Sequence, residues 1–237
     1  MLEKAGAEYN AEILNPIEHA SQYETVSKKA LNLGIYSTDL SYASIYEQSA
    51  EIMVFSACSK KLSDALGVTE AFTERTIERI ESNLADKDSI LDIVTETYYI
   101  TDTHLKTSQR ASLSALILAG AWMEGLHIAC HVASTQPENE LIRLRLMEQK
   151  FALNNLLILT RQYADDPKMQ PVLQDLEAVH SLFAEVNEVV NTEPSVQTHN
   201  DTQSSTINTG RELVAEAATI EQIRERVSAI RAGYIQP

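Results

Sequence analysis

Two stretches of the chain read alike, Gly34–Ala43 (GIYSTDLSYA) and Gly120–Ala129 (GAWMEGLHIA). Each begins with a glycine, has an aromatic residue two positions later, and continues with apolar residues at the spacing of one helix face. A glycine inside a helix costs about 1 kcal/mol relative to alanine, so two in matching contexts predict helices whose backbones pack closely across a pseudo-twofold core. The match is short. Internal duplication and chance similarity between two buried helices therefore both remain open as explanations.

The composition favours helices around this pair. Of 237 residues, 44% are hydrophobic, while 7 glycines and 6 prolines are too few for a sandwich or barrel rich in tight turns. The 19 basic and 34 acidic residues give a net charge of -15, which repels nucleic-acid phosphates and anionic membrane surfaces. The longest apolar run, Ala115 to Met123, is too short to span a membrane. We therefore predict an all-α protein with no nucleic-acid partner and no membrane span.

Helical spacing and capping signals predict a bundle of seven or eight helices, with a pseudo-repeat core formed by 17–66 and 108–134. The second of these segments has Glu124 as its single charged residue after Arg110, so we expect it to be the central helix. The other helices are expected near 70–84, 86–106, 138–164, 168–190 and 219–232.

The chain divides by composition into three parts. Residues 1–190 are expected to form the helical bundle, and the polar stretch 191–210 a linker or loop. Residues 211–237 are expected to supply a C-terminal helix that docks on the bundle. A small hairpin is predicted where Ser205–Ile207 and Arg211–Val214 flank the turn-forming triplet 208–210.

The chain also resembles a family of uncharacterised helical envelope proteins of Gram-negative bacteria. The residues that carry the resemblance are Ala30–Tyr36 with Asp39, Leu40 and Tyr42, and Ser112–Leu118 with Gly120, Trp122 and Glu124–Leu126. Members of that family look like lipoproteins, so the resemblance implies a mature periplasmic or outer-membrane-associated domain with a membrane tether in its precursor. It brings no catalytic residues. The N-terminus lacks a signal peptide, which leaves a cytoplasmic location open.

Close packing of the two matching segments would bring together one set of polar and aromatic side chains. We take five of them as candidate binding residues: Tyr36, Asp39, Tyr42, Trp122 and Glu124. The predicted function is that of a non-enzymatic protein with a binding or structural role and no cofactor. Its predicted partner is an unknown protein or small molecule. Glu124 has apolar neighbours, and a buried carboxylate needs a partner. In the structural interpretation it bonds to a neighbouring helix, with Tyr36 or Tyr42 as candidate donors.

A di-metal helical-bundle enzyme is the alternative. Two Glu-x-x-His units place a carboxylate and an imidazole one turn apart, as in di-iron or di-manganese bundles, where two further glutamates complete the site. The residues of this interpretation are Glu96, Glu124, His127, Glu148, Glu177 and His180, holding iron or manganese. Counted from the predicted turns, Glu96 and Glu124 differ in depth by roughly 9 Å along the helix axes, which argues against a shared site.

Overall fold

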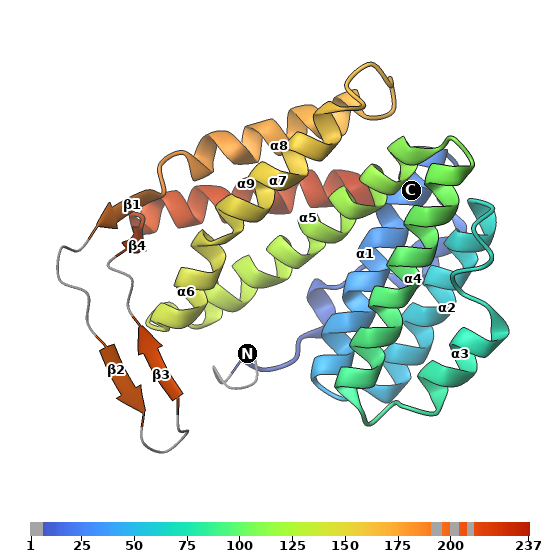
Figure 1. Ribbon diagram of the computed structural model, residues 1–237, viewed down its shortest axis with the longest axis horizontal. Helices are drawn as coiled ribbons and strands as arrows, with labels where there is room; N and C mark the ends of the chain where they lie inside the picture. The colour runs from blue at the N-terminus through green and yellow to red at the C-terminus, as the bar shows by residue number, and fades with distance from the viewer. Residues whose placement is uncertain (1–6, 191–195, 200–203, 208–210) are drawn as a thin grey trace.

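The structure, a computed structural model, describes residues 7–190, 196–199, 204–207 and 211–237, with side chains for 7–189 and 213–237. These residues form an all-α fold, as predicted, with four short strands beside the helices (Figure 1). Two 3-10 helices, η2 (Ala11–Ile13) and η3 (Ile17–Ser21), precede the α-helices. The nine described α-helices are α1 (Val26–Ile45), α2 (Ser49–Ala65), α3 (Glu74–Glu81), α4 (Lys87–Thr107), α5 (Ala111–Thr135), α6 (Glu140–Met147), α7 (Gln149–Arg161), α8 (Gln170–Phe183) and α9 (Ala217–Ile235).

The two matching segments lie on α1 and α5, which form the closest helix pair of the fold. A Cβ atom added to Gly34 would lie 2.0 Å from the Ile117 carbonyl oxygen, and one added to Gly120 would lie 2.1 Å from the Leu31 carbonyl oxygen. Each glycine thus meets the residue three positions before the other glycine, so the contact is locally twofold. The predicted contact between these regions is confirmed. The contact does not test a duplication, which remains a prediction.

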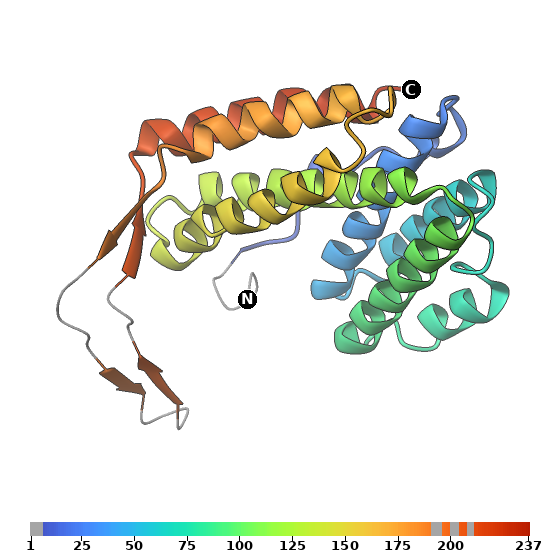
Figure 2. The same cartoon turned by 45° about the horizontal axis from the view of Figure 1, so that its top comes forward.

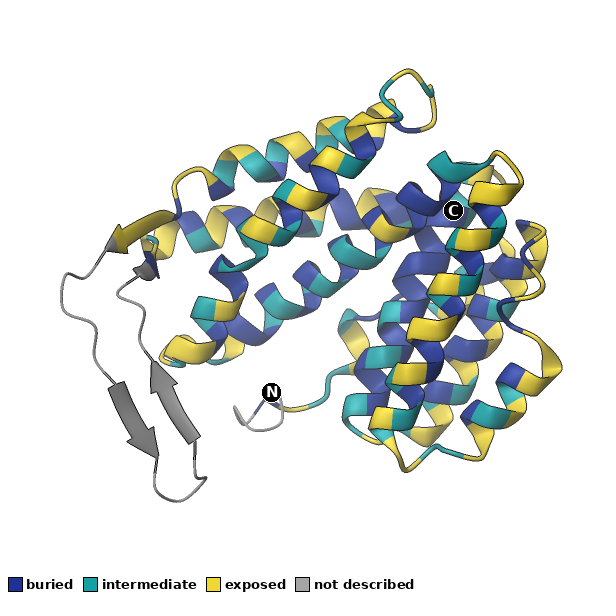
Figure 3. Cartoon of the chain, in the orientation of Figure 1, coloured by how far each residue is buried: buried dark blue, intermediate teal, exposed yellow. Residues whose placement is uncertain are grey.

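The remaining helices pack on this pair in two groups. The helices α2 and α4 lie beside α1, and α3 contacts α2 and α4. On the other side of the molecule α6 and α7 contact α5, while α8 and α9 run side by side and α9 crosses both α5 and α1 (Figure 2). Buried residues accordingly concentrate on α1 and α5 (Figure 3).

Helix α5 is long and apolar enough to cross a membrane by length and composition alone. Of its most apolar 18-residue window, 67% is buried inside the bundle. Contacts with α1, α4, α7 and α9 therefore account for its apolar composition as well as a membrane would.

Several helix boundaries differ from the prediction. The expected helix 17–66 is interrupted twice. Its first turn is the 3-10 helix η3, and α1 begins only after Thr25, whose Oγ1 accepts the Lys28 N–H at 3.2 Å. The chain then reverses at Glu47, a non-glycine residue with a φ of 55°, so no glycine or proline marks the turn. The expected helix 138–164 also divides, into α6 and α7 at Glu148, which brings the number of described α-helices to nine.

The strand prediction was wrong in its pairing. The four strands are β1 (Asn187–Val190), β2 (Val196–His199), β3 (Ser204–Ile207) and β4 (Arg211–Val214). The predicted hairpin would pair β3 with β4, but β4 pairs with β1 and β3 with β2, both antiparallel. Helix α8 ends at Phe183, so the residues of β1 are outside the helix and can pair with β4. The β1–β4 pair lies next to the C-terminal end of α8 and the N-terminal end of α9 (Figure 1). The turn triplet 208–210 and most of the predicted linker lie outside the described residues.

Candidate functional site

The centre of the bundle contains a buried ion pair between α5 and α9. Arg231 donates two hydrogen bonds to Glu124, from Nε to Oε2 and from Nη2 to Oε1, both at 2.8 Å. The side chain of Glu124 is 0% exposed and that of Arg231 is 9% exposed. Burial lowers the pKa of Arg231, but the hydrogen bonds and charge of Glu124 raise it, and the net shift is upward. The bidentate hydrogen bonds join α9 to the α1–α5 pair.

Asp39 on α1 faces this ion pair and is 0% exposed. Its Oδ2 accepts the Asn15 N–H at 3.2 Å, whereas its Oδ1 has no hydrogen-bond partner among the described residues. Burial, followed by the negative charge of Glu124, raises the pKa of Asp39 well above its ordinary value, and Arg231 opposes this only in part. One guanidinium faces two carboxyl groups, and burial beside Glu124 favours the protonated form of Asp39.

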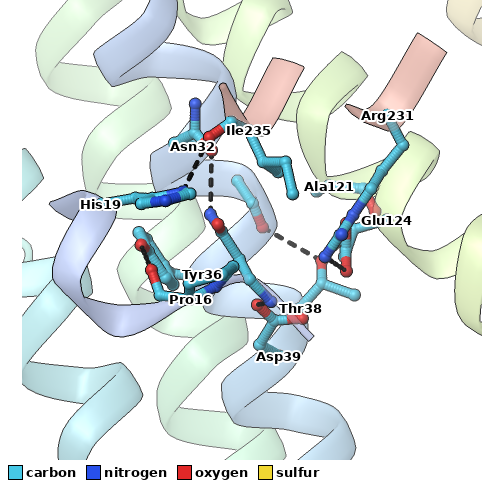
Figure 4. Close-up of polar contacts among 12 residues, drawn as sticks. Pro16, His19, Asn32, Tyr36, Thr38, Asp39, Ala121, Glu124, Arg231 and Ile235 are labelled. Atoms are coloured by element: carbon cyan, nitrogen blue, oxygen red, sulfur yellow. Dashed lines mark hydrogen bonds and ion pairs between the residues drawn. The ribbon is translucent and has the colours of Figure 1, made fainter. Parts of the chain in front are cut away.

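A chain of amides and hydroxyls extends from Asp39 to the C-terminal end of α9 (Figure 4). The side-chain amide of Asn15 donates to Asn32 Oδ1 at 3.0 Å and to Tyr23 Oη at 3.1 Å. Asn32 in turn donates to the Tyr234 carbonyl at 2.9 Å, and both Tyr23 and His19 donate to the Ile235 carbonyl. The last carbonyls of a helix lack partners within the helix. Here side chains near the N-terminus supply those partners and bind α9 to α1.

The aromatic candidate residues have separate partners. Tyr36 is 0% exposed and donates from its hydroxyl to the Pro16 carbonyl at 2.7 Å, so it does not contact Glu124 as predicted (Figure 4). Tyr42 stacks on Tyr9 with ring centroids 5.3 Å apart, and its hydroxyl accepts the Asn10 N–H at 3.2 Å. Trp122 is half-buried. Asp39 and Glu124 thus come together as expected, but the tyrosines hold the chain before α1 in place and do not line a shared pocket.

The six residues of the di-metal interpretation do not come together. Glu124 is held by Arg231, and His127 lies one turn away. The other four contact different side chains: Glu96 with Arg79 at 2.7 Å, Glu148 with Arg145 at 2.6 Å, Glu177 with Arg161 at 3.0 Å, and His180 with Asn154 at 2.9 Å. In the described part of the chain, no three or more His, Cys, Asp or Glu side chains are grouped to hold a metal ion. The physical reason is that Glu96, Glu148 and Glu177 lie at the surface, with side chains 49%, 35% and 47% exposed, where each pairs with an arginine.

Arg231 is the central residue that sequence reasoning missed. It lies four residues after Val227 and one after Ile230, on the apolar face of α9. A charged residue at a core position of an amphipathic helix signals a buried partner. Glu124 gave the same signal on α5, so pairing these two misplaced charges would have found the site. Asn15 and Asn32 gave no such signal. Asn15 is an uncharged polar residue at a turn of the chain, and Asn32 is an uncharged polar residue within a long helix.

Comparison with known proteins gives no assignment for this site: no protein-family model, curated protein sequence or solved structure matches the chain. The resemblance to envelope proteins thus remains a proposal.

Replacing Asp39 by asparagine is expected to change how stability depends on pH. The folded-state pKa of Asp39 lies above the unfolded value, so the native state holds a proton that the unfolded state loses above about pH 4. Stability from this group is complete below that pH and is lost as the pH rises towards the folded-state pKa. As the pH rises, the unfolding free energy of wild type should therefore fall relative to that of Asp39→Asn, by up to about 1.4 kcal/mol per pH unit.

Chemical denaturation from pH 5 to 8 measures this difference. Asp102→Asn is the control, because Asp102 lies near Lys106 and Ser114 and its folded-state pKa is lowered. The folded and unfolded pKa values of Asp102 both lie below pH 5, so the difference in stability between wild type and Asp102→Asn should stay constant from pH 5 to 8. A difference between wild type and Asp39→Asn that is constant over the range would mean that Asp39 is ionised in the folded protein.

Proposed function

We propose that this chain is a non-enzymatic helical protein of the Gram-negative cell envelope with a binding or structural role. One observation supports it: hydrogen bonds between polar core groups connect separate segments of the chain. Arg231 holds Glu124, Asn15 donates to Asp39, and the C-terminal carbonyls of α9 receive side chains from the N-terminal region. Groups arranged in this way join chain segments and hold no reacting atom in position. The envelope location is supported by the sequence resemblance, and fractionation of cells that express the natural gene tests it.

A binding role is better served by the surface than by this core. An open groove of about 260 Å³ lies between α4, α5 and α7. Tyr98, Tyr99, Leu118, Leu159 and Tyr163 contribute its large side chains, and Ala111, Ser114 and Ala115 are the small residues on α5. Tyr99 is 73% exposed and Leu118 is 38% exposed, so the groove presents apolar surface to solvent. The groove is therefore where we expect an unknown protein or small molecule to bind.

Tyr99→Ser tests the binding role. We expect cross-linking capture of partners by the tagged protein in its own cells to fall, with the melting temperature unchanged, because an exposed ring contributes little to folding. Ile158→Ser is the matched control: Ile158 is 63% exposed on α7 but does not line the groove. Equal capture by wild type and both variants would remove the groove as the binding site. Loss of stability without loss of capture in Asp39→Ala and Glu124→Ala would favour a structural role for the core.

A further inference from the structure

The segment of residues 7–15, which we call the N-terminal strap, packs against the central helix pair ahead of η3. It contains η2 and runs from the N label towards the start of α1 in Figure 1. Ala7 is 7% exposed and Leu14 is 6% exposed, so both ends are anchored in the core. Between them Tyr9 stacks on Tyr42.

Titratable side chains of α1 and α5 hold the polar groups of the strap. Tyr42 Oη accepts the Asn10 N–H at 3.2 Å, and Asp39 Oδ2 accepts the Asn15 N–H at 3.2 Å. The side-chain Nδ2 of Asn10 lies 3.2 Å from His131 Nε2. The strap is thus fastened by groups whose hydrogen-bonding roles depend on protonation.

The orientation of the Asn10 amide determines the protonation of His131. Asn10 caps η2, and its Oδ1 accepts the Glu12 N–H at 2.9 Å. Its Nδ2 therefore points at His131, and an amide NH₂ can only donate. His131 Nε2 must accept, which requires a neutral imidazole with its proton on Nδ1. A second proton would turn Nε2 into a donor facing a donor, and the bond would be lost.

His127, one turn before His131, lies below the same segment. Its Nδ1 is buried and has no hydrogen-bond partner among the described residues. The pKa of His127 is lowered overall, and burial is the largest cause. Arg231 and His131 also lower this pKa, whereas the Glu124 charge and the Ile13 backbone raise it. A proton on His127 would therefore add a poorly solvated charge beneath the strap. The other titratable groups around the strap are Asp39 and Tyr42 on α1, Glu51 on α2, and Glu8, Tyr9 and Glu12 within it.

We propose that the N-terminal strap is a proton-sensitive element, closed while His131 and His127 are neutral and opened when acidification protonates them. The hinge is Asn15. A carboxyl group can accept a hydrogen bond when it is ionised and when it is protonated, so acidification leaves Asp39 able to hold the Asn15 N–H. Opening from residue 7 towards residue 13 would uncover Tyr42 and Tyr46, whose rings Tyr9 now covers.

Hydrogen exchange of the strap tests this proposal. Amide protection factors of residues 7–15, corrected for the intrinsic pH dependence of exchange, are measured between about pH 8 and pH 5, where histidines change charge. We expect protection in the wild type to fall by about tenfold on acidification, the effect of losing one hydrogen bond. Protection in α1 and α5 measured on the same samples, together with the melting temperature, excludes global unfolding as the cause.

Two substitutions separate this mechanism from general acid lability. In His131→Gln the side-chain oxygen accepts the Asn10 amide at every pH, so the fall should be largely lost. In Asn10→Asp the carboxylate still accepts the Glu12 N–H and also accepts from a protonated His131, so protection should rise on acidification. His180→Gln, remote from the strap, should behave like wild type. A flat wild-type profile, or an unchanged fall in both His131→Gln and Asn10→Asp, would overturn the proposal.

Discussion

Replacing Gly34 by alanine is expected to destabilise the protein by about 3 kcal/mol or more, although the same change in an ordinary helix is stabilising. The new Cβ would lie 2.0 Å from the Ile117 carbonyl oxygen and 2.7 Å from the Ala121 backbone nitrogen. Both obstacles are backbone atoms, so no side chain can move aside, and α1 must separate from α5. Because the two helices form the centre of the bundle, their separation loosens every element packed on them. Gly120→Ala should destabilise the protein in the same way, because its Cβ would collide with the Leu31 carbonyl.

Gly125→Ala is the matched control, since Gly125 lies on the same helix as Gly120 and its added Cβ would meet only the Thr38 methyl group at 4.0 Å. It should raise stability by up to about 1 kcal/mol, the ordinary helix preference for alanine. Chemical denaturation of the three variants gives the comparison. If Gly34→Ala and Gly120→Ala match Gly125→Ala, the close approach of α1 and α5 is incorrect.

Replacing Arg231 by methionine is expected to cost about 3–5 kcal/mol, which corresponds to a fall in melting temperature of about 6–20 °C for a chain of this size. The substitution leaves Glu124 fully buried with no opposite charge, beside the carboxyl group of Asp39. Methionine fills much of the space of arginine, so the loss reports the unpaired charge more than a cavity. Removing the ion pair also loosens α9, which carries the C-terminal carbonyls held by Asn32 and Tyr23.

The double variant Glu124→Gln with Arg231→Met separates charge from packing. It removes both charges, so it should recover a large part of the stability lost in Arg231→Met alone. Arg224→Met is the control on the same helix, because the exposed ion pair of Arg224 with Glu221 contributes little. Thermal unfolding of wild type, Arg231→Met, the double variant and Arg224→Met gives the comparison. A double variant as unstable as Arg231→Met would mean that Arg231 acts by packing and not by charge.

Much of the fold followed from local sequence. Low glycine and proline content, apolar spacing and capping residues predicted an all-α protein, and two glycines in matching contexts predicted the α1–α5 contact. These features are local because helix formation depends on neighbours three or four residues apart. The breaks after Ile45 and at Glu148 had no such signal, since ordinary residues occupy the turns.

The tertiary structure alone decided how distant groups pair. Sequence showed that Glu124 has apolar neighbours and would need a partner if buried, but a buried carboxylate accepts equally from a tyrosine, an amide or a guanidinium. Arg231, 107 residues after Glu124, became the partner because α9 crosses α5 at that depth. The same limit applied to the strands, where β4 pairs with β1 instead of with β3, its neighbour in sequence. Local pattern determined which residues must be buried, and only packing in three dimensions determined what neutralises them.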